Sequence, residues 1–99
     1  MSRWIVLVSP VGGVAAEGSS VRTLAEFEGS AEEALAEFAK RVNTYDRDVT
    51  KVKRREVFRC SDRAYFVRVN GRLHEFEYFF QLAELVADTK SPDLPDTVS

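Results

Sequence analysis

The first chemistry to consider is nucleophilic catalysis, because the chain contains one cysteine, Cys60, and one histidine, His74. A thiol that is activated by an imidazole must lie about 3 Å from it. The alternation of the sequence places both side chains on one face of a three-stranded meander. Their strands flank the strand between them, which separates the two groups by about 10 Å. We therefore predict no catalytic residue and no enzyme activity, with Cys60 buried and His74 partly buried.

The residues that could bind a metal, or act as paired catalytic carboxylates, also have simple structural explanations. One cysteine and one histidine cannot supply three close ligands, so we predict no metal and no cofactor. Glu75 and Glu77 share one face of a strand and could be described as paired carboxylates. Outward-pointing charges next to basic neighbours explain these two residues at least as well.

A basic face of the same meander is the pattern that best predicts binding. With a period of two, this face carries four basic residues around three apolar ones: Lys53, Arg55, Arg59 and Arg68 with Val57, Phe66 and Leu73. Sheets that hold single-stranded nucleic acid use basic side chains for phosphates and aromatic rings for bases. Only Phe66 is available for stacking, however. A solvated sheet face, or one that meets acidic side chains, is the alternative.

The charge distribution is uneven along the chain. The 99 residues carry a net charge of −2, but residues 51–75 hold eight basic and three acidic side chains. Residues 1–50 hold five basic and eight acidic side chains, and residues 76–99 hold one and five. These acidic flanks should repel a long polyanion. We therefore expect a strongly polarised molecule.

Residues 51–78 predict the three antiparallel strands that position these groups. The expected strands are 51–60, 64–69 and 72–78, and Asn70-Gly71 between the last two indicates a two-residue type I′ turn. This turn pairs Val69 with Arg72. The first turn uses Ser61-Asp62 or Asp62-Arg63, and either choice gives the same faces. The face opposite the basic one is then largely apolar and carries Val52, Phe58, Cys60, Tyr65, Val67, Val69, His74, Phe76 and Tyr78.

The remaining elements surround this meander. The apolar run 4–8 predicts an interior strand buried on both faces, residues 9–20 a loop, and residues 21–28 a second strand. Ser30 and Glu33 have the spacing of a capping box, which predicts a helix over 31–44. A second helix is expected over 79–87. The sequence thus predicts an α+β fold with the order β-β-α-β-β-β-α, a mostly antiparallel sheet with two helices packed on one face, in a single domain of residues 1–90 and a flexible C-terminal tail of residues 91–99.

More apolar surface is predicted than two short helices can cover. Leftover apolar surface usually marks a protein interface. We rank a protein-interaction or regulatory module first, self-associating through its sheet as a homodimer or binding an acidic protein partner. Single-stranded nucleic-acid binding on the basic face is second and catalysis third. The single cysteine favours a reducing cytoplasm, and no apolar run approaches the roughly 20 residues that span a bilayer.

Two segments, FEGSAEEALAEFAKRVNTY and VKRREVFRCSDRAYFVRVNGRLHEFEYFFQLAELV, carry a family resemblance. Residues 27–88 resemble a small, functionally uncharacterised family of actinomycete-type bacterial proteins. The shared motifs are a D/E-G-x-x-x-E/A-A-L helix start, a K-R-R-x-x-F-R strand, an aromatic strand ending in V-x-G, and a closing F-x-x-A-E-L helix. The resemblance implies these element boundaries and a cytoplasmic bacterial setting. It implies no site residues.

Overall fold

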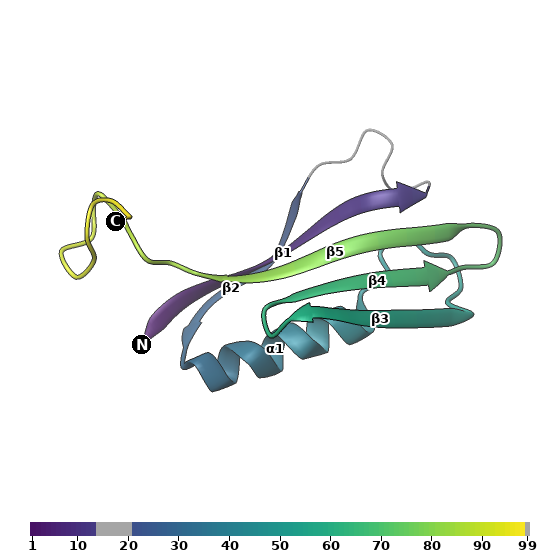
Figure 1. Cartoon of the computed structure of the whole chain (residues 1–99), viewed down its shortest axis with the longest axis horizontal. Coiled ribbons are helices and arrows are strands. Elements are labelled where there is room, and N and C mark those ends of the chain that lie inside the picture. The colour runs from purple at the N-terminus through teal and green to yellow at the C-terminus, as the bar shows by residue number, and fades with distance from the viewer. Residues whose placement is uncertain (14–20, 99) are drawn as a thin grey trace.

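The computed structural model describes residues 1–13 and 21–98, in which a five-stranded antiparallel sheet carries one helix on one of its faces (Figure 1). The strand order across the sheet is β2-β1-β5-β4-β3. The elements are β1 Ser2–Gly13, β2 Arg22–Gly29, α1 Ala31–Thr44, β3 Arg54–Ser61, β4 Ala64–Asn70 and β5 Glu75–Glu84. Within the described ranges, no helix is long and apolar enough to span a lipid bilayer.

The helix α1 begins at the predicted capping box. The backbone N–H of Glu33 donates to the Ser30 hydroxyl at 3.1 Å, and the backbone N–H of Ser30 donates to the Glu33 carboxylate at 2.8 Å. Hydrogen bonds from the Ser30 backbone N–H and the Ser30 side chain to the Glu33 carboxylate lower the pKa of Glu33. Glu37 and Arg41 form the expected ion pair at 2.7 Å. The predicted helix bounds and the predicted cap are both confirmed.

Ser30→Ala is expected to lower the free energy of unfolding by about 1 kcal/mol, because the orphan N–H of Glu33 loses its acceptor. Urea denaturation followed by circular dichroism measures this difference. Thr50→Ala, at an exposed position in the connector after α1, is the control and should change the free energy by less than about 0.5 kcal/mol. Equal stabilities of the Ser30→Ala variant and the wild type would contradict the role of the cap.

The core lies between α1 and one face of the sheet, which we call the covered face. Ala34, Phe38 and Val42 repeat along α1 and are at most 2% exposed. They pack over alternate residues of the strands, which is the pattern that a half-buried sheet requires. The strand residues of this core are Trp4, Val6, Val8, Val67, Val69, Phe76, Tyr78, Phe80 and Leu82.

The predicted second helix, residues 79–87, is wrong, because β5 continues to Glu84. The spacing of Phe79, Leu82 and Ala83 fits a helical stripe, but Phe80 and Leu82 also alternate with Phe79 as in a strand. The strand forms because β5 lies between β1 and β4 and pairs with both. A central strand forms hydrogen bonds with both neighbouring strands. The alternation of its buried side chains then matches the two-residue period of a strand instead of the 3.6-residue period of a helix.

The strand β1 also differs from its prediction. It lies inside the sheet as expected, but it extends from Ser2 to Gly13, and residues 14–20 of the predicted loop 9–20 lie outside the described residues. Only Trp4, Val6 and Val8 of its apolar run are buried. Ile5 and Leu7 are half-buried, because α1 covers just one of the two faces.

The turn between β4 and β5 is longer than predicted. Val69 pairs with Phe76 instead of Arg72, and the N–H of Gly71 donates to the carbonyl of His74 at 2.8 Å across a four-residue loop. The shift is an even number of residues, so the predicted faces of β4 and β5 are confirmed. It brings the aromatic pair Phe79-Phe80 opposite Phe66 and Tyr65, which a two-residue turn would leave unpaired.

The strand β3 presents the opposite faces from those predicted. Val57 pairs with Val67 and Phe58 with Phe66, and the register is irregular between Arg59 and Ser61. One extra residue at such a bulge exchanges the two faces of a strand. Phe58 therefore leaves the covered face, and Arg55, Val57 and Arg59 join it. Cys60 at this irregularity, and Val52 before the strand, are exposed instead of buried.

Candidate functional site

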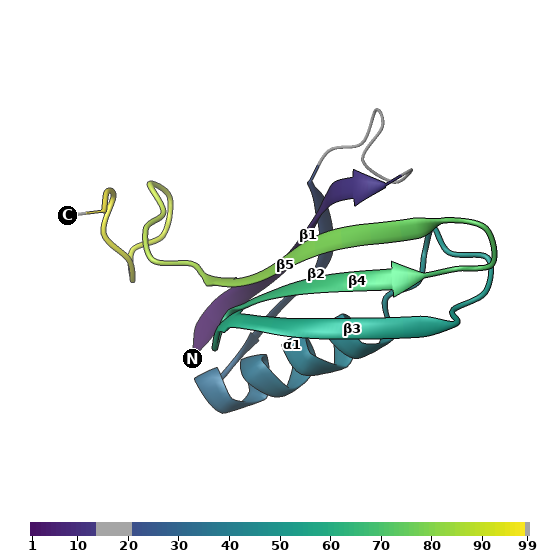
Figure 2. The same cartoon turned by 45° about the vertical axis from the view of Figure 1, so that its right-hand side comes forward.

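The sheet face opposite α1, which we call the uncovered face, carries a contiguous group of apolar side chains. Figures 1 and 2 show α1 on one side of the sheet only. Phe58, Phe66 and Phe79 lie next to one another on β3, β4 and β5, and the Phe58 and Phe66 ring centroids are 6.1 Å apart. On β1, Ile5 and Leu7 extend this surface. We call these five residues the apolar belt.

A row of charges borders the apolar belt on the same face. The Arg68 guanidinium lies 3.3 Å from Glu56, 3.3 Å from Glu75 and 3.6 Å from Glu77. Arg54 lies 3.4 Å from Glu56. The Arg68 guanidinium is also 5.5 Å from the centroid of the Phe58 ring. Three carboxylates around Arg68 leave this row without a positive excess, and Glu75 and Glu77 have the basic neighbour that was expected.

The seven residues of the predicted basic face do not lie on one surface. Phe66 and Arg68 are on the uncovered face, while Arg55, Val57 and Arg59 are on the covered side of β3. Lys53 precedes β3, and Leu73 is 82% exposed in the loop after β4. The Arg55 guanidinium donates to the Tyr45 carbonyl at 2.8 Å and so stabilises the fold. The prediction of a single basic face is wrong because the bulge exchanges the two faces of β3.

Cys60 and His74 lie at opposite ends of β4. Cys60 precedes the turn that leads into β4, and His74 belongs to the loop that follows Asn70. The strand between them is seven residues long, which corresponds to about 20 Å. The predicted shared face is therefore wrong, and both side chains are exposed, whereas Cys60 was expected to be buried and His74 partly buried. At this separation they cannot exchange a proton directly.

A polar cluster ties the connector after α1 to the covered face. The Tyr78 hydroxyl donates to Asp48 at 2.9 Å, and the Arg22 guanidinium donates to the same carboxylate oxygen at 2.7 Å. Arg22 also donates to the Tyr45 hydroxyl. The Tyr45 ring packs edge-on against the rings of Tyr78 and Phe80. Asp48 thus joins β2, β5 and the connector at one point.

The pKa values of this cluster follow from its contacts. Burial alone would raise the pKa of Asp48, but hydrogen bonds from Arg22 and Tyr78 and the charge of Arg22 hold that pKa below its usual value. Burial and the hydrogen bond to Asp48 raise the pKa of the Tyr78 hydroxyl. The hydrogen bond to Asp48 raises the pKa of Arg22. All three groups therefore keep one charge state at neutral pH, as a structural cluster does.

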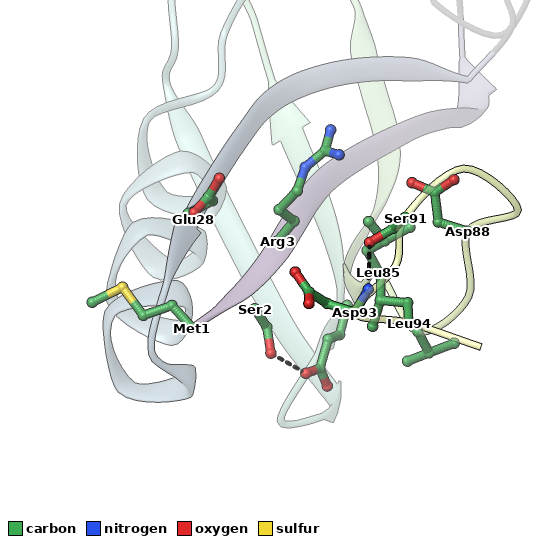
Figure 3. A pocket seen from close by; sticks show the side chains of 11 residues that line it. Met1, Ser2, Arg3, Glu28, Leu85, Asp88, Ser91, Asp93 and Leu94 are labelled. Atoms are coloured by element: carbon green, nitrogen blue, oxygen red, sulfur yellow. Dashed lines mark hydrogen bonds between the residues drawn. The ribbon is translucent and has the colours of Figure 1, made fainter. Parts of the chain in front are cut away.

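A hollow of about 520 Å³ lies between the start of β1 and the C-terminal segment (Figure 3). Its lining includes Arg3 and four carboxylates, and the Ser2 hydroxyl donates to one of them, Glu84. The others are Glu28, Asp88 and Asp93. In residues 1–13 and 21–98, no three His, Cys, Asp or Glu side chains lie close enough to share a metal ion. The hollow offers scattered acceptors without a convergent site.

Comparison of the chain with protein-family models, with curated proteins and with solved structures gave no match. The features of this protein that indicate a function are therefore the apolar belt and the charged row beside it.

Sequence reasoning missed four of the five belt residues. It placed Phe58 on the covered face and Phe79 in a helix, and it left the outward face of residues 4–8 undefined. The signal for Phe79 was present, because Phe76, Tyr78, Phe80 and Leu82 alternate without interruption. The position of Phe58 depends on a bulge that no local residue pattern specifies.

Proposed function

We propose that this protein is a protein-interaction module that forms a homodimer through the apolar belt. The observation that carries the proposal is the row of Phe58, Phe66 and Phe79 on a sheet face that α1 does not cover. Phe58 is 44% exposed. A contiguous apolar patch rimmed by polar residues is typical of a protein interface.

The charges next to the belt favour a protein partner over a nucleic acid. Aromatic rings on a sheet can stack bases, but phosphates must then meet unpaired cations. Beside the belt, Arg68 is surrounded by Glu56, Glu75 and Glu77. These carboxylates would repel a phosphate backbone, whereas ion-paired side chains are common at the rim of a protein interface. Nucleic-acid binding stays a prediction of lower rank.

The size of the uncovered face suits a dimer of moderate affinity. Strands lie about 4.8 Å apart and alternate residues about 6.8 Å apart, so a belt three rows deep across the four strands β1, β5, β4 and β3 offers on the order of 400 Å². The charged row raises this to roughly 500 Å². Standard interfaces bury about 800 Å² on each partner. We therefore expect a homodimer with a dissociation constant of about 1–100 µM.

The centre of this interface is Gln81. It lies on β5, the middle strand of the sheet, opposite Leu7 on β1 and Ala64 on β4. In a symmetric dimer of two stacked sheets, the two-fold axis lies in the plane between the sheets and passes through the middle of the belt. This holds whether the axis is parallel or perpendicular to the strands. Gln81 of the two copies should then face each other across sheets about 10 Å apart, which is too far for a disulfide but within reach of a short bismaleimide cross-linker between cysteines at this position.

Gln81→Cys in a Cys60→Ser background is therefore expected to form a covalent dimer with a short bismaleimide reagent. Leu35→Cys in the same background is the control, because Leu35 is 39% exposed on α1. Non-reducing gel electrophoresis over a concentration series gives the rate for each variant. The Gln81→Cys variant should cross-link at least about tenfold faster, since only its two thiols lie within the span of the reagent in the dimer. Equal rates would contradict the proposed interface.

Sedimentation equilibrium of the wild type measures the dimer without a cross-link. Phe58→Glu should raise the dissociation constant at least about tenfold, because a carboxylate replaces a ring in the belt. Leu73→Glu is the matched control: it adds the same charge at the highly exposed Leu73 and should leave the constant unchanged. A wild type that stays monomeric at several hundred micromolar would overturn the proposal.

A further inference from the structure

The strand β3 forms one edge of the sheet. In the described part of the chain it pairs with β4 on one side and with no strand on the other (Figure 2). Alternate residues of an edge strand direct their N–H and C=O groups away from the sheet, where a further strand can bind them. From Val57 to Ser61 every residue of β3 is exposed. This half of the edge is therefore accessible from the side.

Cations gather along this edge without carboxylate partners in the part of the chain that the structure describes. Lys51, Lys53 and Arg59 are exposed, and no carboxylate in residues 1–13 and 21–98 forms an ion pair with them. By contrast, Arg68 on the neighbouring strand has three carboxylates around it. The edge of β3 thus holds positive charge that the fold itself does not neutralise.

Apolar side chains flank the same edge on both faces of the sheet. Val57 is 41% exposed on the covered side, beyond the reach of α1, and Phe58 is 44% exposed on the uncovered side. A strand added beside β3 would point its side chains alternately to these two faces. The cations Lys53 and Arg59 share the covered side with Val57, whereas the uncovered side offers Phe58.

We propose that the β3 edge binds an extended acidic segment of a partner protein by strand addition. The segment forms a sixth strand next to β3: its backbone pairs with the outward N–H and C=O groups, its carboxylates meet Lys53 and Arg59 on the covered side, and its apolar side chains contact Phe58 on the uncovered side. The inference goes beyond the homodimer, because a sheet stacked on the uncovered face leaves the backbone of the edge free.

The charge of the edge selects among the possible occupants. A second copy cannot add its own β3 there without bringing Lys53 and Arg59 near identical cations. A single-stranded nucleic acid would meet the cations but could not pair with the backbone of the strand. An acidic segment in an extended conformation satisfies both the backbone and the charges.

The probe is a capped synthetic peptide as long as β3, in which glutamate alternates with valine and threonine. It is titrated into ¹⁵N-labelled full-length protein at low salt. We expect binding at about 10–100 µM, with the largest amide shifts in β3 and slower hydrogen exchange there. The same peptide N-methylated at alternate residues keeps its charge but cannot pair as a strand, and it should bind at least about tenfold more weakly.

Charge reversal tests the cations. The double variant Lys53→Glu and Arg59→Glu should weaken peptide binding at least about tenfold, because it places carboxylates against carboxylates. The control, Lys40→Glu with Lys90→Glu, changes the net charge equally at exposed positions of α1 and the C-terminal segment, and it should bind like the wild type. Amide spectra of both variants show whether each is folded.

Three results would overturn this inference. They are equal binding of the N-methylated peptide, shifts centred on β2 instead of β3, and a preference for an oligothymidylate of similar charge over the peptide. The homodimer is measured separately by sedimentation, and the backbone and cations of this edge stay exposed in both its monomer and its dimer, although the dimer covers Phe58. Failure of peptide binding would therefore leave the dimer intact as a proposal, and failure of the dimer would leave this one.

Discussion

Phe38→Ala is expected to lower the free energy of unfolding by about 3–5 kcal/mol, the largest effect of any single substitution considered. Phe38 is 1% exposed at the middle of the buried stripe of α1, and its ring centroid lies 5.5 Å from that of Tyr65. Truncation leaves a cavity between α1 and the sheet. A domain of this size has a total stability of about 5–10 kcal/mol, so the variant should be close to unfolding at 37 °C.

Leu35→Ala is the matched control for this prediction. Leu35 lies on the same helix one turn earlier but is 39% exposed. Its truncation should cost less than about 1 kcal/mol, because it leaves no buried cavity. Urea denaturation of both variants, followed by circular dichroism, gives the two values. Similar losses in the two variants would mean that α1 packs on the sheet through a different face.

Asp48→Ala is expected to lower the free energy of unfolding at pH 7 by about 2–3 kcal/mol. The substitution removes the acceptor of the Tyr78 hydroxyl and the partner of the Arg22 guanidinium. Tyr78 is fully buried, so its hydroxyl would lose a hydrogen bond that water cannot replace. Asp46→Ala, at an exposed position in the same connector, is the control and should stay within about 0.5 kcal/mol of the wild type.

The same cluster predicts a pH dependence of stability. The pKa of Asp48 is lower in the folded protein than the value of about 3.9 that aspartate has in an unfolded chain. The folded state therefore favours the charged carboxylate. This contribution is fully present above about pH 4 and is lost as the pH falls through the folded pKa.

The difference in unfolding free energy between wild type and Asp48→Ala should thus be constant from pH 5 to 7 and shrink below about pH 4. Denaturation curves at several pH values measure it. A difference that grows as the pH falls would show that Asp48 does not act through its charge.

Local patterns in the sequence determined the elements whose hydrogen bonds are local. The capping box of Ser30 and Glu33 and the bounds of α1 are as predicted. A helix closes its hydrogen bonds within itself, so its residues suffice to define it. The alternation in β4 and in the first half of β5 likewise fixed which of their side chains are buried.

Only the tertiary structure decided the features that depend on distant residues. Residues 79–84 fit a helix or a strand, and pairing with β1 makes them a strand. The bulge near Cys60 moves Phe58 to the uncovered face and Arg55 to the covered one. Because side chains alternate along a strand, one extra residue reassigns a whole face, and that residue is set by pairing across the sheet. The apolar belt forms because of these two effects of pairing between distant strands.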